Sequence, residues 1–213
     1  MLWAIFSDVH GHSKALKRVI KDAQRRGARA FVNLGDLGNG TSHELLSQIP
    51  ARSVLGNWEV SSWHLLPPPW RDVVRRWPFQ LREKDVLFCH ASPVWPEEVK
   101  TVDDALTYVR EHGSWFALFP PLAEKSDALW EAFAHMGSQN IRIAFHGHTH
   151  IQKVWILTAD NHLRAWKNPL IPLRQDGSLY IIGVGSVGRP LDGPGTCYAL
   201  WDDQANEVKL IRL

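Results

Sequence analysis

The chain has 213 residues, of which 45% are hydrophobic and 22% charged, a composition that excludes a disordered protein and allows a sizeable core. Its 24 basic and 22 acidic side chains leave a formal net charge of only +2, which is too small to indicate a nucleic-acid or membrane partner. Eleven tryptophans are unusual for this length and must be buried or stacked somewhere in the fold.

The N-terminal segment is apolar for only a few residues before it turns polar at Ser7 and Asp8. It lacks the basic start and the long apolar stretch of a signal peptide, and no later segment approaches the length of a membrane span. The two cysteines, Cys89 and Cys197, lie in apolar runs, where packed, reduced thiols are commoner than a disulfide, although a disulfide between them stays open. We therefore expect a cytoplasmic protein.

The first part of the chain alternates short apolar runs with amphipathic segments. The runs are typical of strands buried on both faces, and the segments carry apolar residues at helical spacing. The predicted order is a strand at 2–6, a helix at 12–27, a strand at 28–36, a helix at 42–49 and a strand at 52–57. This β-α-β-α-β order predicts parallel strands joined by crossover helices.

The later part is richer in strands. After three prolines the predicted elements are a helix at 70–77, strands at 79–83 and 85–91, helices at 101–112 and 121–136, and strands at 141–146, 151–159, 162–167, 178–185, 196–202 and 207–213. Leu129, Phe133 and Met136 form an apolar stripe that we expect in the core. With no repeat and no long linker, we expect one domain over residues 1–213, built from two packed sheets with helices outside.

Residues 144–151, AFHGHTHI, place His146, His148 and His150 at every second position. In an extended backbone alternate side chains share a face, so the three imidazoles would point the same way. Converging neutral imidazoles usually bind a metal ion or relay protons. The alternative is a polar loop that is merely rich in histidine.

Seven metal-capable side chains follow predicted strands, each after an apolar run. They are Asp8, His10, Asp36, Asn57, His90, His148 and His150. Taken singly, each is commonly a helix cap, a turn residue or a hydrogen-bonded polar side chain. Because the carboxyl ends of strands in an α/β sheet open onto one crevice, their joint order favours a shared ligand-binding site.

The ordered set Asp8-x-His10, Gly35-Asp36, Gly56-Asn57-x-Glu59, His90 and Gly147-His148-x-His150 resembles the calcineurin-like metallophosphoesterases, above all their small prokaryotic phosphodiesterase branch. The similarity covers nearly the whole chain, since residues 184–202 also resemble a segment near the C-terminus of that branch. It implies an α/β (α+β) fold, a four-layer α/β/β/α sandwich of two packed mixed β-sheets flanked by helices. It also implies a binuclear centre of divalent transition-metal ions.

Carried over position by position, the resemblance implies two ligand sets joined by one bridging carboxylate. The first set is Asp8, His10 and His150, the second is Asn57, His90 and His148, and the bridge is Asp36. His146 has no ligand counterpart, and we expect it to be structural. Nitrogen and oxygen ligands without a thiolate favour manganese, iron, cobalt, nickel or zinc over calcium or a structural zinc. Of these we expect manganese, with the others as alternatives. Cys89 is expected to point away from His90, and we exclude it as a ligand.

The activity implied is hydrolysis of small, nucleotide-like phosphodiesters by attack of a metal-bridging hydroxide. A phosphomonoesterase and a diadenosine-polyphosphate hydrolase with the same metal site remain alternatives. A non-catalytic scaffold, such as the retromer subunit of this fold, is an alternative from a different class, although such proteins typically lose ligands. We expect a small phosphoester as the partner, and neither membrane nor nucleic acid; the oligomeric state stays open.

Trp58 stands where many members of the family have a histidine that assists the leaving group. An indole N–H cannot give up a proton at useful pH, so we expect substrates with good leaving groups, such as activated esters or nucleotide anhydrides. His12 is the candidate catalytic acid, and Asp36 the central catalytic carboxylate. The alternative for His12 is a residue that merely starts a helix.

Substrate contacts are expected from Arg189, from Ser186 with the backbone amides beside it, and from Trp58. The protein-phosphatase relatives carry an arginine soon after the aspartate matching Asp36, and residues 36–41 contain none. The aromatic stretch 113–121 is predicted either to stack on a base or aryl group as a lid or to pack in the core.

Overall fold

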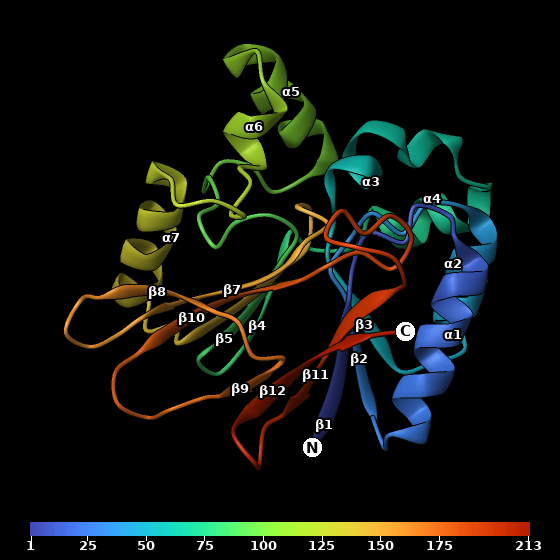
Figure 1. The fold of residues 1–213 in the computed structure, drawn as a ribbon. Helices are drawn as coiled ribbons and strands as arrows, with labels where there is room; N and C mark the ends of the chain where they lie inside the picture. The colour runs from blue at the N-terminus through green and yellow to red at the C-terminus, as the bar shows by residue number, and fades with distance from the viewer.

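The computed structural model describes residues 1–213 as two six-stranded sheets that pack face to face (Figure 1). The first sheet has the order β3 (Ala51–Ser53), β2 (Ala30–Asn33), β1 (Leu2–Phe6), β11 (Cys197–Asp202), β12 (Glu207–Arg212) and β9 (Leu170–Pro172). The second has the order β4 (Gln80–Glu83), β5 (Val86–Cys89), β6 (Ile143–His146), β10 (Leu179–Val184), β7 (Gln152–Leu157) and β8 (Leu163–Trp166). Both sheets are mixed, which confirms the predicted fold class.

Parallel pairing is confined to two groups of strands. In the first sheet β1, β2 and β3 run parallel, as the β-α-β-α-β start predicts, and in the second β5, β6 and β10 do. The other neighbours, such as β1 with β11 and β7 with β10, are antiparallel. The carboxyl ends of the strands within each parallel group therefore meet at one edge of their sheet, where the loops that follow them lie close together.

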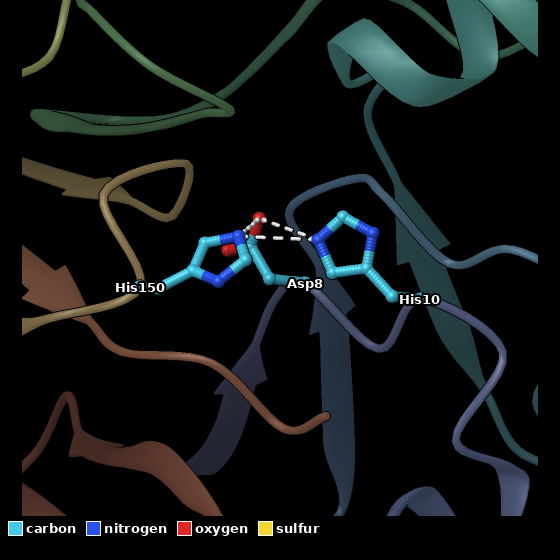
Figure 2. A group of neighbouring side chains, drawn as sticks. All are labelled: Asp8, His10 and His150. Carbon is cyan, nitrogen blue, oxygen red and sulfur yellow. Dashed lines mark hydrogen bonds and ion pairs between the residues drawn. The ribbon is translucent and has the colours of Figure 1, made fainter. Parts of the chain in front are cut away.

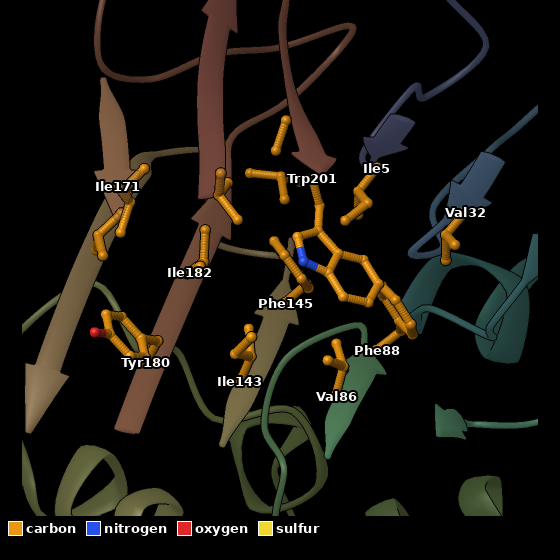
Figure 3. Close-up of a cluster of buried hydrophobic side chains, with 14 of the residues drawn as sticks. Ile5, Val32, Val86, Phe88, Ile143, Phe145, Ile171, Tyr180, Ile182 and Trp201 are labelled. Atoms are coloured by element: carbon orange, nitrogen blue, oxygen red, sulfur yellow. The ribbon is translucent and has the colours of Figure 1, made fainter. Parts of the chain in front are cut away.

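Three apolar layers hold the sandwich together. α1 (Ser13–Arg25) and α2 (Gly40–Ser47) lie beside the first sheet, and α7 (Asp127–Ser138) covers the second (Figure 1). Between the sheets 18 buried residues form the inner core, where the rings of Phe88, Phe145 and Trp201 lie within 6.1 Å of one another (Figure 3). Burying aromatic rings of this size supplies much of the apolar area that stabilises a sandwich.

A further apolar cluster accounts for five of the tryptophans. It lies among α3 (Asn57–Ser62), the 3-10 helix η1 (Trp63–Leu65), α4 (Pro68–Val74), α5 (Val102–His112) and α6 (Trp115–Leu118). The tryptophans packed against it are Trp58, Trp63, Trp70, Trp77 and Trp95. These short helices lie at the same end of the sandwich in Figure 1, above the ends of β1, β2 and β5.

Some element boundaries differ from the sequence-based expectation. The helix expected at 121–136 begins only at Asp127, because Ser126 accepts a hydrogen bond from the Leu129 N–H and so starts the helix there. α4 begins earlier than expected, at Pro68, since proline fits the first helical turn, where no N–H partner is needed. The short elements α3, α6 and β9 were not predicted. Their periodic patterns are too brief to be recognised.

Two other expectations concern the cysteines and the membrane. Cys89 and Cys197 are both free and buried, in agreement with the predicted reduced thiols. None of the helices combines the length and the apolar character that a membrane span requires. The apolar stripe of α7, Leu129, Phe133 and Met136, is buried as expected.

His43 of α2 is a buried histidine held between two indoles. Its ring lies 5.5 Å from the ring centres of both Trp70 and Trp77, nearly parallel to each, and only 2% of the residue is exposed. Burial lowers the pKa of His43 to about 4. The folded chain therefore holds this imidazole neutral at pH values where the unfolded chain protonates it.

This difference predicts a loss of stability in acid. As the pH falls from about 6.5 towards 4, the unfolded chain binds a proton at residue 43 and the folded chain does not, so the free energy of unfolding falls. In His43→Phe, whose ring can keep the stack, the loss between pH 7 and pH 4.5 should be smaller by about 2 kcal/mol. Urea unfolding at the two pH values measures it, with the exposed His64→Phe as control. Equal losses in wild type and His43→Phe would contradict the prediction.

Candidate metal centre

All seven predicted ligand residues lie in loops at one end of the sandwich. Two follow β1, one follows β2, one begins α3 after β3, one follows β5, and two lie between β6 and β7. In that order they are Asp8 and His10, Asp36, Asn57, His90, and His148 and His150. The structure thus brings together side chains that are up to 142 positions apart in the sequence, counting from Asp8 to His150.

The first group consists of Asp8, His10 and His150, whose potential ligand atoms lie within 4.8 Å of one another (Figure 2). The Nε2 atoms of the two imidazoles are 3.1 Å apart, and His150 Nε2 lies 3.2 Å from Asp8 Oδ1. Two ligand atoms that each lie about 2.1 Å from one ion are about 3.0–3.4 Å apart. Two of the three pairs have this spacing, and the third, His10 Nε2 to Asp8 Oδ1, is slightly wider at 3.8 Å.

The second group is built around His90. Its Nε2 lies 2.9 Å from Asn57 Oδ1 and 3.6 Å from Asp36 Oδ1, and its ring centre is 5.1 Å from that of His148. The other oxygen of Asp36, Oδ2, lies 3.7 Å from His10 Nε2 in the first group. Asp36 thus presents one carboxylate oxygen to each group, which is the arrangement a bridging ligand requires.

The backbone at these ligands is unusual. Asp8, His10, Asp36, His148 and His150 all have positive φ, between 47° and 61°. Non-glycine residues rarely adopt this left-handed conformation, and such strain concentrates at functional sites. The expectation that His146, His148 and His150 share one face of an extended strand is therefore wrong. The strand ends at His146, and a turn aims the two later imidazoles.

Close packing of the loops depends on glycine at one position above all. A Cβ on Gly147 would overlap Ser7 Oγ and would lie 2.6 Å from Asp8 Oδ2. The absence of a side chain lets the next amide, His148 N–H, donate to Asp8 Oδ2 at 2.9 Å. Glycine at this position therefore permits the close approach between the histidine loop and the residues that follow β1.

Two buried carboxylates dominate the charge of the site. Asp8 is fully buried, and only 2% of Asp36 is exposed. Burial and then the charge of Asp8 raise the pKa of Asp36. Burial also opposes ionisation of Asp8, but the imidazoles around it, His150 above all, outweigh burial and hold the Asp8 pKa below its usual range. Ionising both carboxylates at this depth therefore calls for a cation beside them.

The imidazoles around these carboxylates are mostly in the form that binds metal. Burial lowers the pKa of His10 to about 4, and burial followed by the His90 charge lowers that of His148 to about 3. Both rings are therefore neutral at pH 7, with a nitrogen lone pair free. Asp8 Oδ1 is buried and meets no hydrogen-bond donor in good geometry. The donor set, its neutral imidazoles and this unpartnered oxygen all fit divalent metal ions.

The imidazoles are oriented from behind by backbone carbonyls. Nδ1 of His90 lies 2.8 Å from the carbonyl oxygen of Leu34, and Nδ1 of His150 lies 2.7 Å from that of Arg189. Donation from Nδ1 leaves Nε2 of each ring as the free lone pair that faces the site. His146 is different. It is fully buried, and its Nδ1 lies 3.0 Å from the Gly147 carbonyl, consistent with the structural role expected for it.

The other predicted residues lie around the centre in different settings. Arg189 and Trp58 line a cavity that also contains His10. Ser186 is fully buried, donates to the Asp8 carbonyl at 2.8 Å and accepts from the Arg189 N–H at 2.7 Å. His12 is the exposed N-cap residue of α1, outside both ligand groups.

Glu59 is a residue of the site that sequence reasoning missed. It is fully buried, and its carboxylate accepts the N–H groups of Asp36 and Leu37, each at 2.7 Å, and of Gly56 at 2.9 Å. One side chain therefore ties the loop after β2 to the loop after β3, and so places Asp36 against Asn57. Glu59 stands two positions after Asn57 and belongs to the sequence motif GNWE. The motif did not predict that its side chain supports the site.

Phe119, in the aromatic stretch 113–121, packs against two candidate ligands, a contact that the sequence did not predict. Its buried ring lies 5.8 Å from the ring centre of His90 and 6.2 Å from that of His148, and Trp95 packs on it at 5.6 Å. The aromatic stretch 113–121 therefore divides, since Phe119 packs behind two candidate ligands whereas Trp115 and Phe116 are 37% and 66% exposed. Of the two predicted fates of this stretch, core packing holds for Phe119.

Comparison with known proteins gives one family. Residues 1–206 match the sequence model of the calcineurin-like phosphoesterase superfamily domain. No curated protein matches the sequence.

Solved structures share the fold. A metallophosphoesterase from Sphaerobacter thermophilus is 22% identical and superposes with a TM-score of 0.75, covering 100% of this chain and 88% of that one. An archaeal phosphodiesterase is 13% identical, with a TM-score of 0.55 and full coverage of both chains. At these identities the likeness shows a common fold.

The role of Glu59 gives a prediction. Glu59→Gln keeps the volume but replaces one accepting oxygen with an N–H₂ group that faces at least one backbone donor, so we expect a loss of about 1–3 kcal/mol in the free energy of unfolding. We also expect at least tenfold weaker binding of Mn²⁺, because Asp36 and Asn57 lose their common anchor. Urea unfolding and calorimetric titration with Mn²⁺ measure the two effects. The exposed Glu44→Gln is the control, and unchanged Mn²⁺ affinity in Glu59→Gln would contradict the assignment.

Proposed function

The chain belongs to the calcineurin-like phosphoesterase superfamily, and on that premise we propose that it is a phosphodiesterase of small phosphodiesters with a binuclear metal centre. In this proposal Asp8, His10 and His150 hold one divalent ion and Asn57, His90 and His148 the other. Asp36 bridges the two. The superfamily generally uses divalent metal ions, and two clusters bring potential ligand atoms within 4.8 Å of one another: Asp8 with His10 and His150, and Asp8 with Asp36 and His90.

One observation carries the proposal. Asp36 is almost completely buried, and its two oxygens face the imidazoles of His90 and His10 at 3.6 and 3.7 Å. A carboxylate buried at this depth is costly to ionise unless cations balance it. Two cations held on either side of one carboxylate are the arrangement that phosphoester hydrolysis uses.

When bound, the ions supply Lewis acidity that neutralises the phosphoryl charge and water that ionises near neutral pH. The chain contributes the fixed geometry. Asp36 is anchored by the N–H of Trp58, which donates to its Oδ1 at 2.8 Å, and by Glu59 behind it. The carbonyls of Leu34 and Arg189 set the imidazole orientations. We assign Ser186 a positioning role because its hydroxyl ties the Asp8 and Arg189 backbones together.

Charge favours a diester over a monoester. A phosphodiester carries one negative charge, whereas a monoester carries close to two at neutral pH. Arg189 is the only arginine or lysine that lines the cavity beside His10. One guanidinium matches one remaining charge on a substrate that the metal ions already neutralise in part. We propose manganese as the native ion because all ligands are nitrogen or oxygen.

The direct test is hydrolysis of bis(p-nitrophenyl) phosphate by protein loaded with Mn²⁺. We expect turnover that EDTA abolishes and that Asp36→Asn lowers by at least about a hundredfold in kcat, because the bridge between the ions is weakened. Asp103→Asn, on the exposed face of α5, should match wild type. We expect kcat/KM for the monoester p-nitrophenyl phosphate to be lower than for the diester.

Protein that binds Mn²⁺ but hydrolyses neither ester would contradict the proposed enzyme and would support a scaffold. A clear preference for the monoester would contradict the diesterase assignment alone.

We also propose His12 as the acid that protonates the leaving group, since Trp58 cannot donate a proton. His12→Ala should then remove the alkaline limb of the pH profile of kcat/KM for an ester with a poor leaving group. Esters with p-nitrophenolate leaving groups should be affected little, because they need no acid. An unchanged alkaline limb in His12→Ala would rule out this role and leave His12 as the residue that starts α1.

A further inference from the structure

A cavity of about 450 Å³ opens directly beside the candidate metal centre. His10, whose Nε2 faces the first ligand group in Figure 2, also forms part of the cavity wall. A phosphoryl group held at the metal centre would therefore place one of its substituents in this cavity. Its volume lies in the range of sites that enclose small organic ligands.

Part of the cavity wall is apolar. It is formed by Trp58 and by the turn that contains Leu65 and Pro67. Leu65 is 69% exposed, although large apolar side chains at a polar metal centre gain by being covered. The exposed Leu65 and the half-buried indole of Trp58 together offer a surface that suits a flat ring.

This wall is held rigidly. η1 ends at Leu65, and the next residue, Leu66, is buried in the apolar cluster of the tryptophans. The Leu66 carbonyl accepts a hydrogen bond from Arg71 Nε at 2.6 Å, which fixes the turn against α4. Trp58 is fixed at its own backbone by the hydrogen bond to Asp36. A preformed surface loses little entropy when a ligand binds to it.

Arg189 supplies the charge of the cavity. Its backbone is fixed on both sides, by the bond from its N–H to Ser186 Oγ and by the bond between its carbonyl and His150 Nδ1. The Arg189 guanidinium forms no ion pair. In contrast, Nη2 of Arg212, at the end of β12, lies 2.7 Å from Asp192 Oδ1. A free guanidinium next to the metal centre suits a phosphoryl oxygen.

Resting on the proposed function, we propose that this cavity binds the ester group of the substrate and selects one with a flat aromatic ring, an aryl or nucleoside ester. The ring lies on the wall of Trp58 and Leu65, and Arg189 contacts the phosphoryl group. Trp58, which replaces a proton-donating residue of the family, thus serves as a specificity-determining residue.

Binding of non-hydrolysable ligands to Mn²⁺-loaded protein tests the proposal without turnover. Calorimetric titration compares methylphosphonate, phenylphosphonate and adenosine 5′-monothiophosphate. We expect phenylphosphonate to bind at least about tenfold more tightly than methylphosphonate, which corresponds to partial burial of one ring. Tighter binding of the adenosine ligand than of phenylphosphonate would assign the ring to a nucleoside, and the reverse order would assign it to an aryl ester; either order supports the proposal.

Variants separate the wall from the charge. Leu65→Ser should lower the preference for phenyl over methyl by about threefold or more. Leu170→Ser, at an exposed leucine on β9 outside the cavity, should leave the preference unchanged. Arg189→Gln should weaken both phosphonates alike and so preserve their ratio. Trp58→Leu is a second test of the wall, since leucine keeps apolar packing but removes the ring.

Equal affinities for the two phosphonates in wild type would overturn the proposal, as would an unchanged preference in both Leu65→Ser and Trp58→Leu. These outcomes are independent of the proposed reaction. Protein that hydrolyses diesters but shows no aromatic preference contradicts the cavity proposal alone. Protein that prefers phenylphosphonate but hydrolyses no phosphoester contradicts the proposed reaction alone.

Discussion

Two carboxylates buried side by side are the constraint around which this protein is arranged. Asp8 and Asp36 have almost no contact with solvent, and lysine and arginine are absent from both ligand groups. Negative charge at such depth is tolerated only when cations or several hydrogen bonds balance it. His10 and His148, whose pKa values burial lowers, do not supply that charge at neutral pH. His150 is different, because the neighbouring Asp8 outweighs its burial and raises its pKa. Divalent ions satisfy the requirement, and the loops hold the ligands ready for them.

The backbone conformations that place the ligands cost free energy, and packing and hydrogen bonds elsewhere in the sandwich offset that cost. Five of the seven candidate ligands adopt left-handed backbone conformations, which are unfavourable for aspartate and histidine. The loops persist because they bond to one another: His10 N–H to the Asp36 carbonyl at 2.9 Å, Gly147 N–H to the His90 carbonyl at 2.9 Å, and Glu59 to three amides. The inner core keeps the strand ends in register, so that one rigid frame supports the strained turns.

The sequence was sufficient to predict the sandwich and the meeting of seven side chains, because apolar runs identify buried strands and polar residues after them identify the loops. It could not reveal how those side chains are aimed. Alternation along an extended strand predicted a common face for His146, His148 and His150, whereas a turn after His146 separates the first from the other two. The supporting roles of Glu59 and Phe119 were not predicted because they lie in contacts with distant loops, which no local pattern encodes.

The most direct test of the account is the number of metal ions that the folded chain binds. Elemental analysis of purified protein, dialysed after exposure to Mn²⁺, should give about two ions per chain, one for each ligand group around Asp36. One ion per chain would contradict the shared bridge. Folded protein that retains no divalent transition-metal ion at all would contradict the claim that the buried carboxylates exist to bind cations.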